Sequence, residues 1–173
     1  MITGLNGDLT ILIVEDDAGH AELIKDNLQE AGVTAPIIHL CDGQAALDFF
    51  FGPTDGSATH REQGKAYLML LDIRMPKVDG IEVLRRIKED PELRKMPVMM
   101  LTTTEDPREI QKCYSLGCSC YVTKPVDYLK FSEMLTRIAL FIMAVQVPQL
   151  MGNNTIHTQT YLEEYSCAEL LVI

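Results

Sequence analysis

The sequence predicts an α/β fold of the doubly wound type, in which one sheet of five parallel strands carries helices on both faces. Five short aliphatic runs alternate along the 173 residues with longer stretches of helical periodicity. The runs are continuously apolar, which indicates strands that are buried on both faces. Right-handed crossovers between parallel strands then place helices on both sides of the sheet.

The first two strand–helix units lie in the N-terminal third of the chain. The β-branched run at 9–14 stops at consecutive acidic residues, and from Ala18 the apolar residues recur at helical spacing. Gly32 is a suitable C-terminal end for that helix. Residues 36–40 form the second apolar run, and 44–51 form the short helix that follows it.

The middle of the chain begins with a long connection. Residues 52–65 contain three glycines and a proline among polar residues, which predicts a surface loop. The third apolar run, 67–71, ends at Asp72. A helix over 80–89, with aliphatic residues on one side, and a fourth strand over 97–101 complete this part of the chain.

The last two helices flank the fifth strand. Pro107 suits the first turn of the fourth helix, and Gly117 suits its end. The fifth strand is expected over 119–123 and the last helix over 128–145. The order is therefore five strand–helix units, which a single parallel sheet accommodates.

Composition and charge exclude several classes of protein. Fifteen Lys and Arg against 25 Asp and Glu give a net charge of −10, whereas nucleic acids and anionic membrane surfaces attract basic proteins. Five cysteines are an odd number for a disulfide framework, and no secretion signal begins the chain. The apolar run at 138–145 is too short to span a membrane. We therefore expect a cytoplasmic protein with no nucleic-acid or membrane partner.

The domain is expected to span residues 8–147. Residues 148–173 would form a C-terminal tail that contains three glutamates and neither Lys nor Arg. A short helix is expected in it near 161–170. A segment of this length cannot form a core of its own, so no second domain is expected.

Polar residues follow the predicted strands at their C-terminal ends. Glu15 and Asp16 follow the first strand, Asp72 the third, Thr102 the fourth and Lys124 the fifth. In an open α/β sheet these ends face one crevice, where such folds bind ligands. Clustered carboxylates need a compensating cation, and this donor set suits Mg²⁺. A lysine and a hydroxyl around one such carboxylate predict phosphoryl transfer with an aspartate as the nucleophile.

The segments that carry these residues resemble the receiver domain of two-component response regulators. The similarity extends over about residues 8 to 145, and it implies a flavodoxin-like sheet with strand order 2-1-3-4-5. Within the family the chain is most similar to the stand-alone receivers that partner bacterial phytochromes. The matching motifs are Val14-Glu15-Asp16-Asp17, Leu70-Leu71-Asp72-Ile73-Arg74-Met75-Pro76 with Asp79-Gly80, Leu101-Thr102-Thr103 and Tyr121-Val122-Thr123-Lys124-Pro125.

The resemblance implies a role in phosphoryl transfer for three residues and a role in the switch for two. Asp72 would be the phosphoacceptor, Lys124 would pair with the phosphoryl oxygens, and Thr102 would hydrogen-bond one of them. Thr102 would also act in the switch, together with Tyr121 at the family's aromatic position. The Lys124–Pro125 peptide would be cis and would orient the lysine.

The resemblance also implies a set of Mg²⁺ ligands. Asp16 and Asp72 would bind the ion, Glu15 would act mainly through a bound water, and the backbone carbonyl of Arg74 would be a further ligand. Asp17 lies one position beyond the family's acidic pair, so we interpret it as the N-cap of the following helix.

The implied function is that of a single-domain response regulator, which a sensor histidine kinase phosphorylates on Asp72; the subgroup resemblance implies a phytochrome-like kinase. Such a domain catalyses only its own phosphorylation and dephosphorylation, and it would signal by contact with a downstream protein or by phosphate relay. One alternative is a degenerate receiver that acts as an interaction module without phosphorylation, although Asp72, Lys124 and the acidic pair are all present. Another is a phosphatase of the haloacid-dehalogenase type, but it would need an aspartate where Arg74 stands.

The last predicted helix is apolar on all sides over 138–145, whereas a helix packed on one sheet buries only a stripe. Either the tail or a second subunit would cover its outer side. A homodimer through this helix is the interpretation that we prefer. Cys113, Cys118 and Cys120 are interpreted as core residues, because no histidine lies near them in the sequence.

Overall fold

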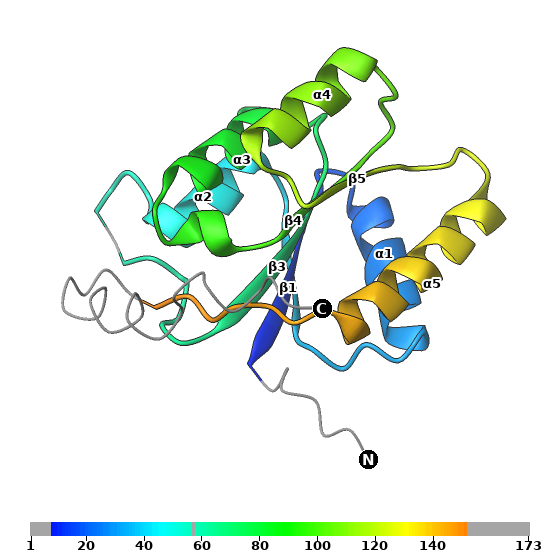
Figure 1. Cartoon of the computed structure of the whole chain (residues 1–173), viewed down its shortest axis with the longest axis horizontal. Helices are drawn as coiled ribbons and strands as arrows, with labels where there is room; N and C mark the ends of the chain where they lie inside the picture. The colour runs from blue at the N-terminus through cyan, green and yellow to red at the C-terminus, as the bar shows by residue number, and fades with distance from the viewer. Residues whose placement is uncertain (1–7, 57, 152–173) are drawn as a thin grey trace, which may run out of the picture.

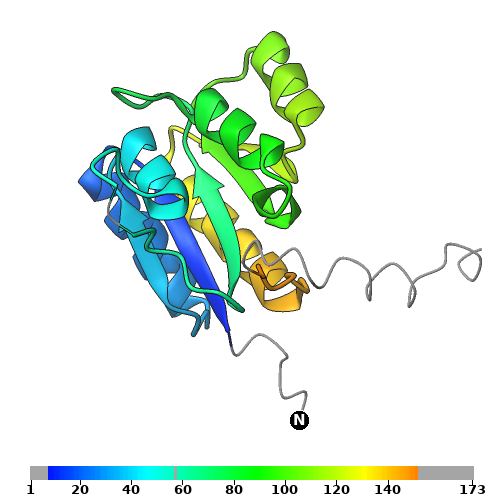
Figure 2. The ribbon, with the colours of Figure 1, turned by 90° about the vertical axis from the view of Figure 1, so that its left-hand side faces the viewer.

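In a computed structural model, which describes residues 8–56 and 58–151, the chain forms a single parallel sheet between two layers of helices (Figures 1 and 2). Its five strands run in the order 2-1-3-4-5, as the sequence predicts, and every neighbouring pair is parallel. The strands are β1 (Leu9–Val14), β2 (Ile37–Leu40), β3 (Ala66–Leu71), β4 (Val98–Thr102) and β5 (Cys120–Thr123).

The helices divide between the two faces of the sheet. They are α1 (Ala18–Glu30), α2 (Gly43–Phe51), α3 (Gly80–Glu89), α4 (Pro107–Leu116) and α5 (Tyr128–Ala144), with a short 3₁₀ helix, η1, at Leu93–Lys95. Helices α1 and α5 pack together on one face, and α2, α3 and α4 cover the other (Figure 1). Among the described residues, no helix is both long and apolar enough to cross a bilayer.

Each α-helix begins directly after an aspartate. In all five cases the aspartate side chain accepts a hydrogen bond from a backbone N–H of the first turn, which satisfies a donor that the helix itself leaves unpaired. The expected capping role of Asp17 is confirmed, since its Oδ1 accepts from the N–H of His20 at 2.9 Å. The five capping residues are Asp17, Asp42, Asp79, Asp106 and Asp127.

The strand and helix bounds agree with the predicted ones to within one or two residues. Strands β2 and β4 begin one residue later than predicted, because the predicted first residues, Pro36 and Pro97, lack an N–H. Their carbonyls still accept hydrogen bonds, from the N–H groups of Ile11 (2.8 Å) and Met69 (3.1 Å). Gly117 ends α4 at φ +98°, a conformation that favours glycine.

Burial follows the position of each strand in the sheet. Every residue of β1, β3 and β4 is buried, which matches the continuous apolar runs. The edge strands β2 and β5 are only partly buried, because each has a neighbouring strand on one side. The polar residues at the ends of the central strands are therefore positioned by strands that are buried along their whole length.

Residues that follow α5 cross to the N-terminal end of β3. Leu150 is buried in the core, its N–H donates to the carbonyl of Lys65, and its carbonyl accepts from the N–H of Gly64, both at 2.9 Å. The expected helix near 161–170 lies outside the described residues, and the division of the chain at residue 147 stays a prediction.

The cysteines at the α4–β5 end lie in the core, as expected. Cys113 and Cys118 are buried and Cys120 is half-buried, and all three are free thiols. Burial raises the pKa of Cys113 and of Cys118 to about 11, so both stay protonated at neutral pH. Protonated, desolvated thiols are poor metal ligands.

Candidate active site

Three ionisable side chains are buried together at the C-terminal ends of the strands. Glu15, at the end of β1, is 2 % exposed, Lys124 after β5 is 5 % exposed, and Asp72 after β3 is 8 % exposed. Charged side chains are seldom this deeply buried unless they are paired. Their pairing is therefore what makes the cluster possible.

Lys124 joins the two carboxylates. Its Nζ donates to Oδ2 of Asp72 at 3.1 Å and also to Oε2 of Glu15. Its backbone N–H donates to the carbonyl of Thr102 at 2.7 Å, which continues the β4–β5 ladder and fixes where the side chain begins. The expected cis peptide between Lys124 and Pro125 is wrong, since no cis bond occurs in the described part of the chain; the X–Pro trans form is the more stable one by default.

Backbone contacts hold Asp72 in place. Its Oδ1 accepts from the N–H of Ile73 at 2.7 Å and lies 3.4 Å from the N of Arg74, while its own N–H donates to Val14 at 3.0 Å. Gly80, the first residue of α3, lies against this turn. A Cβ there would lie 2.0 Å from the carbonyl oxygen of Asp72, so only glycine allows the helix to approach so closely.

The carboxylates of Glu15, Asp16 and Asp72 offer oxygen atoms that all lie within 4.8 Å of one another. With Lys124 as their cationic partner, this group retains a formal charge of −2 when all three are ionised. The donors are hard oxygens, and Asp16 is exposed, so water molecules can complete a coordination shell. This donor set fits a Mg²⁺ ion, which prefers a few carboxylates and several waters.

Thr102 has a buried hydroxyl that lacks a hydrogen-bond partner among the described residues. A buried unpaired hydroxyl is costly, by about 1–3 kcal/mol, and native proteins seldom leave one without a reason. Thr102 ends β4, on the strand next to Asp72, so an acceptor group bound at Asp72 would supply the missing partner. The Thr102 hydroxyl is thus available to donate a hydrogen bond to a group bound at Asp72.

Tyr121 of β5 lies half-buried, and its hydroxyl donates to the carbonyl of Thr104 at 3.0 Å. Burial raises the pKa of Tyr121 to about 12, so the hydroxyl remains a donor at neutral pH. This hydrogen bond joins β5 to the loop that leads into α4. The two residues that the resemblance implies for a switch, Thr102 and Tyr121, therefore lie on neighbouring strands, and within residues 8–56 and 58–151 the Thr102 hydroxyl has no hydrogen-bond partner.

Comparison with known proteins shows the family to which this chain belongs. The model of the response regulator receiver domain family matches residues 11–139. The chain belongs to this family. A crystal structure of a receiver domain from Rhodospirillum rubrum superposes with a TM-score of 0.76 at 46% identity, covering 83% of this chain and 99% of that one.

Two response regulators, one of them a phytochrome response regulator, are similar to this receiver domain over most of their length. Rcp1 of Synechocystis is 32% identical over 79% of this chain and 90% of its own length, and its Mn²⁺-bound form superposes with a TM-score of 0.72. The phosphorylated cyanobacterial phytochrome response regulator RcpA is 30% identical, with a TM-score of 0.69 over 80% of this chain and 97% of its own. The family resemblance noted in the sequence, including its subgroup, is confirmed.

The structure of the receiver domain also shows contacts that sequence reasoning missed. Nε2 of His39 lies 2.7 Å from the carbonyl oxygen of Glu15, so this nitrogen carries a hydrogen and donates. The ring comes from β2, where His39 stands opposite Ile13 in the parallel register. A histidine within the aliphatic run of β2 was the available signal, but the register that aims it at Glu15 could not be read from the sequence.

The loop between β3 and α3 has two further anchors. Nζ of Lys77 lies 2.5 Å from Oδ2 of the buried Asp42, and Nη2 of Arg74 lies 2.7 Å from Oε1 of Glu109 in α4. Lys77 has φ +64°, an uncommon conformation for a residue other than glycine. The backbone of Arg74 borders the site through its N–H. The role of its carbonyl as a metal ligand stays a prediction.

Proposed function

We propose that this receiver domain is the phosphoacceptor of a two-component phosphorelay, modified on Asp72 by a sensor histidine kinase. The observation that carries the proposal is the combination, at one carboxylate, of a buried lysine, a trio of oxygen donors and an unpaired buried hydroxyl. A phosphoryl group has negative charge to be offset and oxygens that accept hydrogen bonds. Each unusual feature of the site answers one of these needs.

The proposed reaction is a displacement at phosphorus. A carboxylate oxygen of Asp72 forms the new P–O bond, the bond between phosphorus and the histidine nitrogen of the kinase breaks, and that nitrogen retains the electron pair. Lys124, already 3.1 Å from Oδ2, would pair with the transferred oxygens, and Thr102 would donate its hydroxyl to one of them. Mg²⁺ held by Glu15, Asp16 and Asp72 would supply the positive charge that lets two anions approach.

The proposed kinase partner is phytochrome-like, because RcpA, to which this chain is similar over 80% of its length, is a phytochrome response regulator. The chain is also similar to the response regulator Rcp1. We place the reaction in the cytoplasm, where such kinases find their phosphate donor. Output would pass to a downstream protein by contact, or onward as phosphate. Catalysis by the chain itself would be limited to its own phosphorylation and dephosphorylation.

The proposed assembly is a homodimer through α5. Ile138 and Ile142 face the core, whereas Leu140, Phe141 and Met143 are exposed on the outer side of the helix. Exposed apolar side chains gathered on one helix face are typical of interaction surfaces. Light scattering should therefore report a dimer that Phe141→Glu disrupts, while a monomer at all micromolar concentrations would refute this assembly.

Acetyl phosphate, a small-molecule phosphoryl donor, tests the proposed chemistry without a kinase. With Mg²⁺, intact-mass spectrometry should show one labile phosphoryl group on the wild-type protein and on Asp26→Asn, a surface control. EDTA or Asp72→Asn should abolish it. Equal labelling of Asp72→Asn would contradict the assignment, and no labelling of the wild type would favour a phosphorylation-independent interaction module.

A further inference from the structure

Helix α4 is held less firmly to the sheet than its neighbour α3. Cys113 is the one buried residue among the ten of α4, and the helix lies at the outer end of its layer in both views (Figures 1 and 2). By contrast, α3 buries Gly80, Val83, Leu84 and Ile87. A helix with little buried apolar surface can shift or open locally at a small cost in free energy.

Polar contacts therefore contribute much of what holds the N-terminal end of α4 in position. Glu109 in the first turn accepts from Nη2 of Arg74 at 2.7 Å, and the carbonyl of Thr104 just before the helix accepts from Tyr121 at 3.0 Å. The first of these contacts joins α4 to the loop that follows β3. Arg74 lies only two residues beyond Asp72, so α4 is tied directly to the edge of the site.

The ion pair between Arg74 and Glu109 is easily broken. The Arg74 side chain is 63 % exposed and the Glu109 side chain 20 % exposed, so water competes for the guanidinium. Oε1 of Glu109 takes the contact, while Oε2 is buried with no hydrogen-bond partner within the described part of the chain. Ion pairs with a solvated partner are weak.

A phosphoryl group on Asp72 would be a stronger partner for the same guanidinium. It carries a charge of about −1.5 to −2 and three acceptor oxygens. Arginine binds phosphoryl groups through two parallel N–H donors. This interaction is stronger than the single hydrogen bond that Arg74 makes to the Glu109 carboxylate. The backbone of Arg74 already lies beside the acceptor, with its N 3.4 Å from Oδ1 of Asp72, so the side chain begins next to the new charge.

We propose that Arg74 exchanges partners, pairing with Glu109 while Asp72 is unmodified and with the phosphoryl group once it is present, and that this exchange releases the first turn of α4. The inference rests on the proposed phosphorylation of Asp72. Phosphorylation would then affect α4 in two ways, through the hydroxyl of Thr102 and, separately, through the side chain of Arg74. Arg74 is thus a positioning residue for α4, through its side chain.

The surroundings of Tyr121 indicate that the Arg74 contact and the Thr102–Tyr121 switch affect each other. Burial is the main cause of the raised pKa of Tyr121, and the nearby charges of Glu109, which raises it, and Arg74, which lowers it, have smaller effects. Movement of Arg74 towards Asp72 would leave the Glu109 carboxylate uncompensated near that hydroxyl. The phosphoryl group would thereby change the surroundings of Tyr121 as well as those of α4.

Hydrogen exchange followed by mass spectrometry tests the partner exchange, with beryllofluoride and Mg²⁺ as the stable mimic of the phosphoryl group. In the wild type, amides in the first turn of α4 should exchange about twofold faster when the mimic binds, the effect expected for loss of one weak ion pair. Glu109→Gln and Arg74→Gln should show the faster exchange without the mimic and little further change with it. The double variant should match either single variant, because both remove the same contact.

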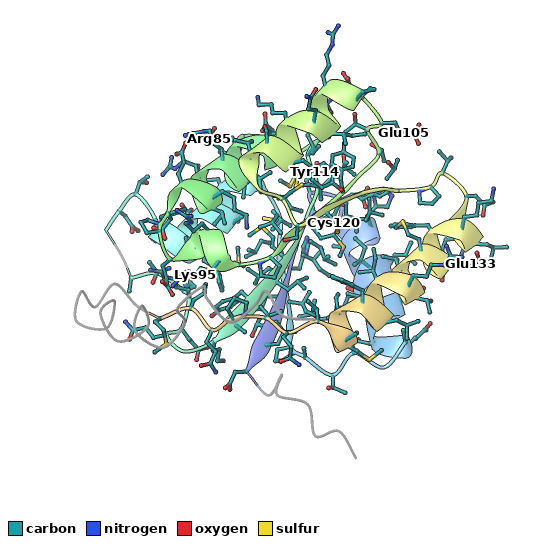
Figure 3. All side chains as sticks on the ribbon, in the orientation of Figure 1. Arg85, Lys95, Glu105, Tyr114, Cys120 and Glu133 are labelled. Atoms are coloured by element: carbon teal, nitrogen blue, oxygen red, sulfur yellow. The ribbon has the colours of Figure 1, made fainter. Side chains whose placement is uncertain are left out.

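Two further variants separate this role from a merely structural one. Arg74→Lys retains the charge without the two parallel N–H donors, so it should retain a weaker response. Glu105→Gln, in the exposed loop before α4, should behave as the wild type does (Figure 3). Unchanged exchange of Glu109→Gln in both states, or a wild-type α4 that does not respond, would overturn the partner exchange. If the mimic also leaves the amides next to Asp72 unchanged, the proposed function fails with it; protection there without a response in α4 refutes the exchange alone.

Discussion

Replacement of Lys124 by methionine removes the cation that lies between Asp72 and Glu15. Both carboxylates are almost fully buried, and Lys124 contacts each of them. Methionine fills a similar volume but carries no charge. With Asp16 close by, the variant would hold three carboxylates and no neighbouring lysine, a formal charge of −3 when all three are ionised.

The expected loss of stability is large. Breaking a buried ion pair by removal of one partner costs about 3–5 kcal/mol, since the remaining charge is left uncompensated. That is a substantial part of the 5–15 kcal/mol that typically separates folded and unfolded states. A divalent cation should restore part of it, because the more negative site binds the ion more tightly and binding to the folded state adds stability.

Urea denaturation with and without Mg²⁺ measures both effects. We expect Lys124→Met to lose several kcal/mol in EDTA and to gain more from millimolar Mg²⁺ than the wild type does. Lys25→Met is the matched control, since Lys25 has only a loose surface pair with Glu22 at 3.9 Å and should change stability by less than about 1 kcal/mol. Equal stabilisation of wild type and Lys124→Met by Mg²⁺ would refute the reasoning.

Three further predictions concern the surroundings of the site. Gly80→Ala should lower both the unfolding free energy and the rate of labelling by acetyl phosphate, because its Cβ would lie 2.0 Å from the carbonyl oxygen of Asp72; wild-type values for both would contradict the packing. Thr102→Ala should accept the phosphoryl group yet show a weaker response to beryllofluoride in α4, β5 and α5 by hydrogen exchange, and a full response would exclude its hydroxyl from the switch. The side-chain hydrogen bond with Lys77 lowers the pKa of Asp42 below the ordinary value of an aspartate. The stability that this carboxylate contributes is therefore present above that ordinary pKa and is lost as the pH falls through the lower folded-state pKa. Asp42→Asn should therefore cost about 1 kcal/mol at neutral pH and flatten this part of the acid unfolding curve, which chemical denaturation at several pH values would show.

The fold could be predicted closely because its local signals agree with one another. Apolar runs of strand length, the capping residue Asp17 and the terminal glycines Gly32 and Gly117 mark consistent boundaries, so the predicted elements agree with the structure to within one or two residues. The gathering of Glu15, Asp72 and Lys124 followed from the rule that parallel strands end at one edge. Strand order came from the family resemblance, since periodicity alone does not set the order of strands.

What the sequence could not reveal are pairings set by register and helix tilt. The contact of Arg74 with Glu109 spans 35 positions and depends on where α4 lies over the β3–α3 loop. The burial of Leu150 depends on a chain crossing that has no local pattern. The expected cis form of the Lys124–Pro125 peptide was carried over from the family, with no feature of the sequence to require it.

The most direct test of the account is the identity of the modified residue. After incubation with acetyl phosphate and Mg²⁺, borohydride reduces an acyl phosphate to an alcohol, and peptide mass spectrometry then locates the altered side chain. The account predicts that the change falls on Asp72, with Glu15 and Asp16 unaltered. Modification of any other carboxylate, with Asp72 intact, would contradict it.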